Sequence, residues 1–298
     1  MKELNGYRLL TEFTADNSGF SQWAFAEKNG IELFIKEFLS PVYPMEESLF
    51  SAAELSDRKA YCDAFVTRKT ALYSAVRQCG NAHIVPVLDF FRYGSKFYIV
   101  TEKVKDAKIT PEEIFSMEPT EKIALMRTLC DALAELHRRG VIHADLKPSN
   151  LLCERTPDGG LSVKIIDFDS SFLQGSRVCP EDIEGDPVYL APETYLAMKG
   201  NAGSLSSQMD VFALGVIFHQ YLLGTLPVFV PGDMHYTFES VLSGGELVFP
   251  ADTDATVKKI LEGMLRKDPR KRRDLKKTAA YLDKIAKTAK KGKGGSGK

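Results

Sequence analysis

The chain has 298 residues, and its 44 % hydrophobic content is enough for one large core or two modest lobes. Its 39 basic and 40 acidic residues nearly cancel, so no global field predicts binding to nucleic acid or to a membrane. The five cysteines are odd in number and lack CxxC spacing, which disfavours disulfides and zinc and favours a reducing, cytoplasmic compartment. Residues 1–8 are polar and predict no export signal.

Short β-like runs and polar turns alternate over the first hundred residues. The Asn29-Gly30 dipeptide predicts a tight hairpin. Residues 39–81 are expected to hold one helix after a Pro-punctuated segment, since apolar residues recur there at helical spacing. The expected strands cover residues 7–13, 22–27, 31–38, 84–93 and 97–104.

Helical periodicity dominates the rest of the chain, over residues 121–139, 209–223, 255–266 and 275–287. The apolar run 211–230 contains His219 and Pro227, so a buried helix that ends in a turn is expected rather than a membrane span. We therefore predict a strand-rich lobe over residues 1–101, a helical lobe over 102–287 and a flexible Lys/Gly tail over 288–298.

The strongest chemical signal is HADLKPSN at residues 143–150, followed by IIDFD at 165–169. Asp145 is suited to accept a hydroxyl proton, and Lys147 to balance charge on a moving phosphoryl group. Asn150 and Asp167 offer the oxygen ligands that magnesium prefers. Taken singly, these residues also suit a turn, a surface lysine or a helix cap. Together, at this spacing, they indicate phosphoryl transfer.

The chain resembles the eukaryotic-type Ser/Thr protein kinase family from about residue 7 to about residue 287. The resemblance implies an α+β, bilobal fold, the use of ATP and Mg²⁺, and a protein substrate with a Ser or Thr acceptor. It also implies that Asp210 anchors the catalytic loop and that Arg272 pairs with Glu193. Five segments carry it: residues 143–150, 165–169, 185–193, 210–215 and 268–272.

The resemblance also implies a set of nucleotide-binding residues. Lys36 would grip the α and β phosphates. Phe34 stands where the family has a small alanine against adenine, and a small Ala24 is expected to compensate for its volume. Gly19 is the one family glycine kept in the phosphate-covering loop, at residues 17–22. The remaining contacts would be the Glu102 carbonyl, the Val104 amide, the gatekeeper Thr101 and Leu152 below the base.

Several positions depart from the family pattern. Lys69 falls where a helix glutamate normally orients the lysine, which leaves Glu54 or Asp63 as substitutes if the helix is shifted. Asp169 replaces a glycine after Asp167-Phe168, and we expect its side chain to point to solvent rather than to a metal. Ala144 replaces an arginine, which favours activation without a phosphorylated loop.

Two other functions stay open from the sequence. A pseudokinase that binds nucleotide as a scaffold would explain the departures, and a regulatory protein partner would fit either that module or an enzyme with a poorly oriented Lys36. A small-molecule phosphotransferase shares the Asp and Asn pattern. Lys147 and the 191–193 segment favour a protein kinase over it.

Overall fold

The computed structural model describes residues 3–16, 21–45, 50–157, 159–201, 203, 205–232 and 234–294, with side chains as far as residue 288. The chain divides into two compact units. The N-terminal unit comprises Met1–Gly80 and Val85–Val104, and the C-terminal unit comprises Asn81–Ile84 and Lys105–Lys298. The boundary between the two units thus lies after Val104. The short segment Asn81–Ile84 also belongs to the C-terminal unit, although it precedes that boundary in the sequence.

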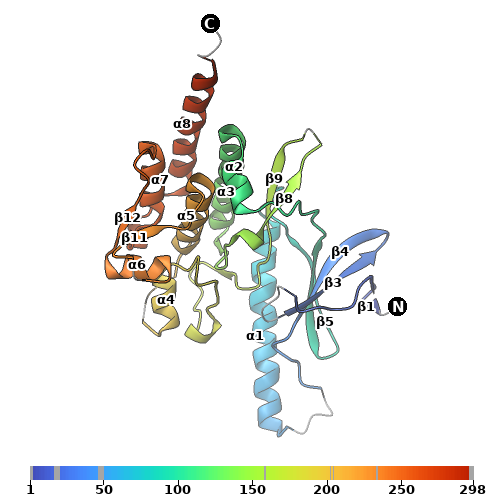
Figure 1. The fold of residues 1–298 in the computed structure, drawn as a ribbon. Coiled ribbons are helices and arrows are strands. Elements are labelled where there is room, and N and C mark those ends of the chain that lie inside the picture. Colours follow the sequence, from blue (N-terminus) through green and yellow to red (C-terminus); the bar gives the residue numbers. More distant parts are fainter. Residues whose placement is uncertain are drawn as a thin grey trace. The chain divides into compact units, whose positions relative to one another are not determined.

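A six-stranded antiparallel sheet forms the centre of the N-terminal unit, in the order β1-β2-β3-β4-β6-β5 (Figure 1). Asn29 and Gly30 both have positive φ and close the β3–β4 hairpin, as the sequence predicts. The strands are β1 (Glu3–Leu4), β2 (Tyr7–Leu9), β3 (Ser21–Lys28), β4 (Ile31–Phe38), β5 (Val87–Tyr93) and β6 (Lys96–Glu102).

The two faces of this sheet carry different side chains because successive residues of a strand point to opposite sides. On one face, Ala24 and Ile35 are paired neighbours in a buried cluster, together with Leu4, Leu9 and Tyr98. The other face carries Lys36, which pairs with Trp23 in β3 and Ile99 in β6. We call this second side the Lys36 face.

The helix expected within residues 39–81 is α1 (Ala52–Arg77). It begins at a capping box in which Ser51 and Glu54 exchange hydrogen bonds between side chain and backbone. Phe65 of α1 packs edge-on against Phe38, with ring centroids 5.4 Å apart, and Tyr73 packs against Phe90 at 5.4 Å. The helix therefore packs against one end of the Lys36 face.

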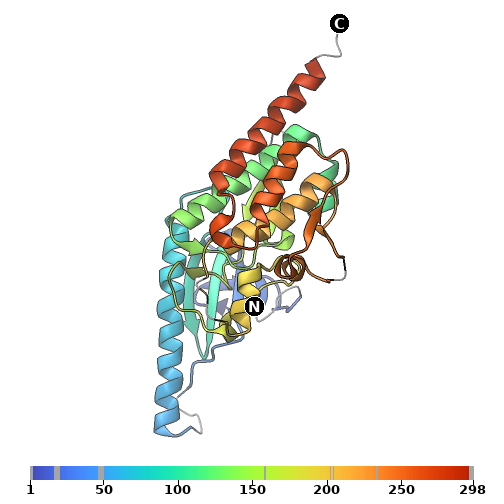
Figure 2. The ribbon, with the colours of Figure 1, turned by 90° about the vertical axis from the view of Figure 1, so that its left-hand side faces the viewer.

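The C-terminal unit is mainly helical (Figures 1 and 2). Its longer helices are α3 (Pro119–Arg138), α5 (Gln208–Leu223), α7 (Ala255–Met264) and α8 (Leu275–Gly294). Shorter elements complete it: α2 (Pro111–Ser116), β7 (Val141–Ile142), η1 (Pro148–Asn150), β8 (Leu151–Arg155), β9 (Leu161–Ile165), β10 (Phe172–Leu173), η2 (Pro180–Asp182), α4 (Pro192–Met198), β11 (Val228–Val230), α6 (Thr237–Ser243), β12 (Glu246–Val248) and η3 (Pro269–Lys271).

Helix α5 accounts for the most apolar run of the sequence. Twelve of its residues, from Met209 to Tyr221, are buried, and the helix ends at Gly224 with φ of 76°. The expectation of a buried helix that ends in a turn is confirmed. Within the described residues, the structure contains no helix with the length and apolar character needed to cross a bilayer.

Helix α8 runs further than the sequence suggests. The tail was expected to be flexible from residue 288, whereas the helix continues to Gly294. Alanine and lysine are strong helix formers, so the Lys-rich segment extends a helix that is already nucleated. Figure 2 shows α8 side by side with α3. An ion pair between Arg127 of α3 and Asp283 of α8, at 2.6 Å, joins the two helices.

Candidate active site

The β8–β9 hairpin brings together two of the predicted metal ligands. Leu151 pairs with Ile165 in this hairpin, so Asn150 immediately precedes one strand and Asp167 closely follows the other. The Ile166 amide donates to the Asn150 carbonyl at 3.1 Å. Asn150 and Asp167, which are 17 residues apart in the sequence, thus lie at the same end of a two-stranded ribbon.

The Asp145 carboxylate is held by three donors within the C-terminal unit. Lys147 Nζ lies 2.8 Å from Oδ2, and Asn150 Nδ2 donates to the same oxygen at 3.1 Å. The Asp186 amide donates to Oδ1 at 3.3 Å. The structure therefore brings Asp145, Lys147 and Asn150 together, and one of the three donors to the carboxylate is charged.

Asp210 of α5 holds the backbone at the start of the loop formed by residues 143–150, which we call the catalytic loop. This side chain is 1 % exposed and accepts from the amides of His143 at 2.8 Å and Ala144 at 2.9 Å. His137 Nε2 lies 2.9 Å from the same carboxylate. Ala144 has φ of 69°, a left-handed conformation that costs energy for a residue with a Cβ. The two hydrogen bonds from Asp210 offset that cost.

His143 is a packed histidine, as expected. It is fully buried, its Nε2 lies 2.9 Å from the Ile166 carbonyl, and its Nδ1 accepts from the Asp145 amide at 3.3 Å. Its ring lies 5.2 Å from that of Phe168. Both ring nitrogens are used in holding the loop, so the geometry gives the ring a structural role.

Asn150 and Asp167 provide a donor set that fits magnesium. Asn150 Nδ2 uses its protons on the Asp145 carbonyl, at 2.8 Å, and on the Asp145 carboxylate, which leaves the amide oxygen as the ligand atom. The described residues contain no cluster of three or more His, Cys, Asp or Glu suited to a metal. Magnesium is commonly held by one or two carboxylates together with substrate phosphates, so this sparse set is compatible with it.

Asp169 does not simply point to solvent. The residue is half-buried, its Oδ1 is inaccessible to water, and its amide donates to Asp167 Oδ1 at 3.3 Å. The expectation of an exposed side chain is therefore wrong. Asp167 has φ of 65°, and the tight turn that follows from it draws the next residues inward.

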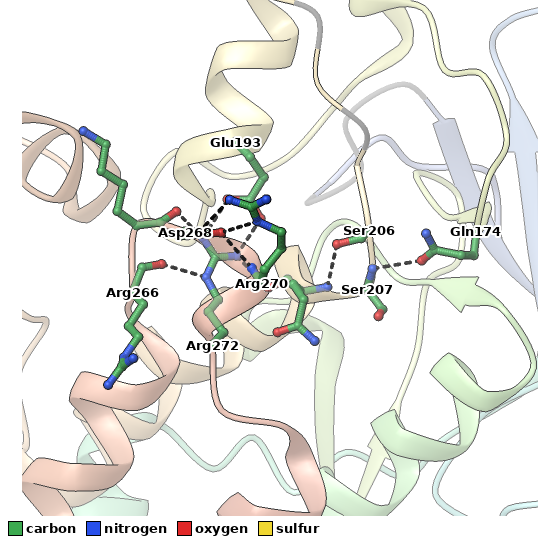
Figure 3. A network of polar contacts seen from close by, with 10 residues as sticks. Gln174, Glu193, Ser206, Ser207, Arg266, Asp268, Arg270 and Arg272 are labelled. Atoms are coloured by element: carbon green, nitrogen blue, oxygen red, sulfur yellow. Dashed lines mark hydrogen bonds and ion pairs between the residues drawn. The ribbon is translucent and has the colours of Figure 1, made fainter.

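The segment after the catalytic loop ends in a buried ion pair (Figure 3). Arg272 is fully buried and contacts both oxygens of Glu193, at 2.5 and 2.7 Å. It also donates to the Arg266 carbonyl at 2.8 Å and to the Gln208 carbonyl at 2.8 Å. The predicted pairing of Arg272 with Glu193 is confirmed, and it is structural because every partner belongs to the scaffold.

Tyr189 shows how the same segment is fixed nearer to Asp145. Burial, reinforced by the negative charge of Asp186, raises the pKa of Tyr189 to about 12. The hydroxyl thus stays protonated and donates to Gln220 Oε1 of α5 at 3.1 Å. The loop that carries Asp186 is in this way tied to the same helix as the catalytic loop.

In the N-terminal unit, Lys36 lies in β4 and is only 7 % exposed. The side chain of Phe34 shares its face, two residues away, and stacks on Trp23 with ring centroids 5.5 Å apart and planes at 24°. Lys36 and Phe34 thus lie on one side of the sheet.

Ala24 is not part of that group. It is fully buried on the opposite face, where it pairs with Ile35, so it cannot compensate for the volume of Phe34. A shift of one residue along a strand moves a side chain to the other face. Trp23, and not Ala24, therefore lies beside Phe34 on the Lys36 face. The two-residue hairpin at Asn29-Gly30 already fixes this register, since it pairs residue 28 with 31 and therefore 23 with 36. That signal identifies Trp23 from the sequence.

The hinge candidates lie at the end of β6 and directly after it. The Thr101 hydroxyl donates to the Glu102 carbonyl at 3.2 Å, and Val104 is half-buried two residues later. Leu152 is half-buried in β8 of the C-terminal unit. Gly19 lies outside the described residues.

The position of the missing glutamate is occupied by a lysine in an aromatic setting. Lys69 Nζ lies 5.8 to 6.0 Å from the ring centroids of Phe38, Phe65 and Tyr73. Glu54 caps the start of α1, fifteen residues away, which is about 22 Å along a helix. Asp63 is exposed. The helix therefore is not shifted so as to bring Glu54 to the position of Lys69.

Comparison with known proteins agrees with this geometry. The family described as "Protein kinase domain" matches residues 66–281. A probable myosin light chain kinase of Dictyostelium discoideum is 29 % identical over 246 residues, which cover 78 % of this chain and 77 % of that protein.

Two further relatives are named serine/threonine-protein kinases. MAP kinase-interacting serine/threonine-protein kinase 2 of Xenopus laevis is 34 % identical over 50 % of this chain and 34 % of its own length. Serine/threonine-protein kinase Pkn1 of Myxococcus xanthus is 31 % identical over 54 % of this chain and 23 % of its own length. These names favour a kinase over a pseudokinase. The chain belongs to the protein kinase domain family and is a protein kinase of the eukaryotic serine/threonine type.

Proposed function

We propose that this kinase transfers the γ-phosphoryl group of Mg-ATP to Ser or Thr hydroxyls of a protein substrate, with Asp145 as the catalytic carboxylate. The observation that carries the proposal is the Asp145 carboxylate held by Lys147, Asn150 and the Asp186 amide. A carboxylate fixed by donors on both oxygens keeps its position while a hydroxyl approaches, and positioning dominates phosphoryl transfer.

Each polar residue of the loop has one proposed role. Asp145 accepts the proton of the substrate hydroxyl, and Lys147 moves from its contact with Asp145 to balance charge on the transferred group. Asn150 Oδ1 and the Asp167 carboxylate would hold Mg²⁺, which would supply positive charge for the phosphate oxygens. Asp210 does no chemistry and keeps the loop backbone in place.

The nucleotide is proposed to contact the residues that the family resemblance indicates. Lys36 binds the α and β phosphates, and the loop that contains Gly19 covers them. The Glu102 carbonyl and the Val104 amide bond the base, and Leu152 packs below it. The Thr101 hydroxyl donates to the same Glu102 carbonyl, and a carbonyl oxygen has two lone pairs, so we propose that it accepts from Thr101 and from the base together.

The substrate and setting follow from the same chemistry. The acceptor is a protein with Ser or Thr, and Lys69 at the place of the family's helix glutamate motivates a regulatory protein partner. The near-zero net charge supports neither nucleic acid nor membrane as partner, and five cysteines without a disulfide among them support a cytoplasmic setting.

Incubation of the chain with labelled ATP, magnesium and a generic protein acceptor tests the proposal. Label is expected on Ser and Thr in the wild type, and to fall by at least about a hundredfold in Asp145→Asn and Asp167→Asn. Asp131→Asn on α3 is the matched control, since that side chain is 64 % exposed. A thermal shift with nucleotide but no transfer in the wild type would overturn the catalytic role and leave a nucleotide-binding scaffold.

A further inference from the structure

Three aromatic rings of the N-terminal unit meet on the Lys36 face, away from α1. Trp23 stacks on Phe34 at 5.5 Å, and Phe25 meets Trp23 at 5.4 Å and Phe34 at 6.3 Å, in both cases nearly edge-on. We call Trp23, Phe25 and Phe34 the aromatic platform. The rings that α1 covers on the same face are others: Phe38, Phe90 and Phe97.

The platform differs from those covered rings in its surroundings. All three of its residues are half-buried, whereas Phe38 and Phe97 are buried. Polar groups hold it at its edges: the Trp23 indole N–H donates to the Asp16 carbonyl at 2.8 Å, and Lys103 Nζ lies 4.3 Å from the Phe25 centroid. Lys103 is in turn paired with Glu32 at 2.7 Å. Half-buried rings fixed in orientation form a preorganised stacking surface.

The platform has the right distance from Lys36 for one nucleotide. Phe34 precedes Lys36 by two residues on the same strand, which corresponds to about 7 Å. Trp23 pairs directly with Lys36 across the ladder. A planar base on the rings would therefore leave its phosphates beside the lysine ammonium.

We propose that Trp23, with Phe34, stacks on the base of the nucleotide and supplies the main base-dependent part of its affinity. The inference rests on the proposed use of ATP and deepens it. Small residues at these two positions would contact a base only through methyl groups, whereas the stacked pair offers a base the ring face that the two rings do not turn toward each other. Loss of an aromatic side chain that stacks on a base typically weakens binding about tenfold or more.

The fluorescence of Trp23 tests this directly, because it is the only tryptophan of the chain. The full chain is titrated with Mg-ATP and, separately, with magnesium tripolyphosphate, which has no base. Quenching is expected with Mg-ATP and not with tripolyphosphate. Equal responses to both ligands would overturn the stacking role.

Variants then measure the contribution by thermal shift and calorimetry. Trp23→Val is expected to weaken Mg-ATP binding about tenfold and to leave tripolyphosphate binding unchanged. Trp23→Phe, which keeps a ring, should restore most of the affinity. Phe91→Leu is the matched control, because Phe91 packs against Tyr98 on the opposite face.

The possible failures can be told apart. Unchanged Mg-ATP affinity in Trp23→Val would overturn the stacking role and leave the kinase proposal standing. Tighter binding in that variant would show that the ring fills the base site, which also overturns it. If the folded wild type binds neither ligand, the proposed use of ATP fails, and the inference fails with it.

Discussion

The two units hold their candidate site residues by different means. In the C-terminal unit, polar contacts from several elements fix each group: Asp210 holds the loop backbone, and Lys147 and Asn150 hold Asp145. In the N-terminal unit, one sheet face presents Lys36 and the aromatic platform by strand alternation. Polar networks demand particular residue types, whereas a sheet face accepts any side chain of suitable size.

The range of the family match agrees with this difference between the two units. It covers residues 66–281, which include every polar loop of the C-terminal unit and leave out β1 to β4. A face built by alternation can exchange small residues for Trp23 and Phe34 while the strands stay paired. The polar loop tolerates fewer changes because a lost partner leaves a buried group unsatisfied.

The largest expected effect is on the buried ion pair. Arg272→Leu should lower the free energy of unfolding by about 3–5 kcal/mol, because it leaves the Glu193 carboxylate without its bidentate partner. Urea denaturation measures this. Arg270→Leu, on an 87 % exposed arginine paired with Asp268, is the control and should leave the free energy of unfolding nearly unchanged. Equal losses in the two variants would remove the distinction between buried network and surface pair.

Asp210→Asn tests whether the catalytic loop depends on its anchor. The amide keeps the size of the carboxylate but turns one acceptor into a donor that faces backbone N–H groups, at a cost of about 3 kcal/mol. Because the loop then shifts, kcat should fall about a hundredfold with little change in KM for ATP. Steady-state kinetics checks this, again beside Asp131→Asn. A raised KM with normal kcat would place Asp210 in binding rather than in positioning.

Ala24→Leu sharpens the assignment of faces in the N-terminal unit. Ala24 is fully buried in a cluster with residues of β1 and β2, so the three extra carbon atoms of leucine should cost about 2 kcal/mol in unfolding free energy. Ala60→Leu on the exposed side of α1 is the control and should be nearly neutral. If Ala24→Leu instead weakened nucleotide binding at unchanged stability, Ala24 would belong to the Lys36 face after all.

The sequence predicts the C-terminal site better than the N-terminal one for a physical reason. In the segment at 143–150, the contacts require Asp145, Lys147 and Asn150 at fixed positions. The amino-acid sequence of this segment therefore indicates which side chains meet. On a strand, by contrast, only the register decides the face, and counting one residue off selects Ala24 in place of Trp23. The inward position of Asp169 was not predictable either, because it depends on the left-handed turn at Asp167.

The smallest expected effect concerns a buried histidine of the C-terminal unit. His219 of α5 is 2 % exposed, and its Nδ1 donates to the Thr225 carbonyl at 2.7 Å, while its Nε2 has no partner among the described residues. Burial lowers the pKa of His219, against the opposing effect of the Thr225 bond. The folded state thus binds its proton at lower pH than the unfolded state does. Stability is retained above the ordinary histidine pKa of about 6.5 and falls as the pH drops below it.

Urea denaturation at pH 7, 6 and 5 measures that loss. In His219→Gln, whose amide donates to the same carbonyl but does not titrate, the decline should be shallower than in the wild type by at most about 1.4 kcal/mol per pH unit, the limit for one proton. His235→Gln, at an exposed position, should leave the wild-type slope unchanged. Parallel slopes in all three proteins would mean that acid sensitivity arises elsewhere. A slope reduced only in His219→Gln would show that the stability of the C-terminal unit depends on one buried histidine of its central helix staying neutral.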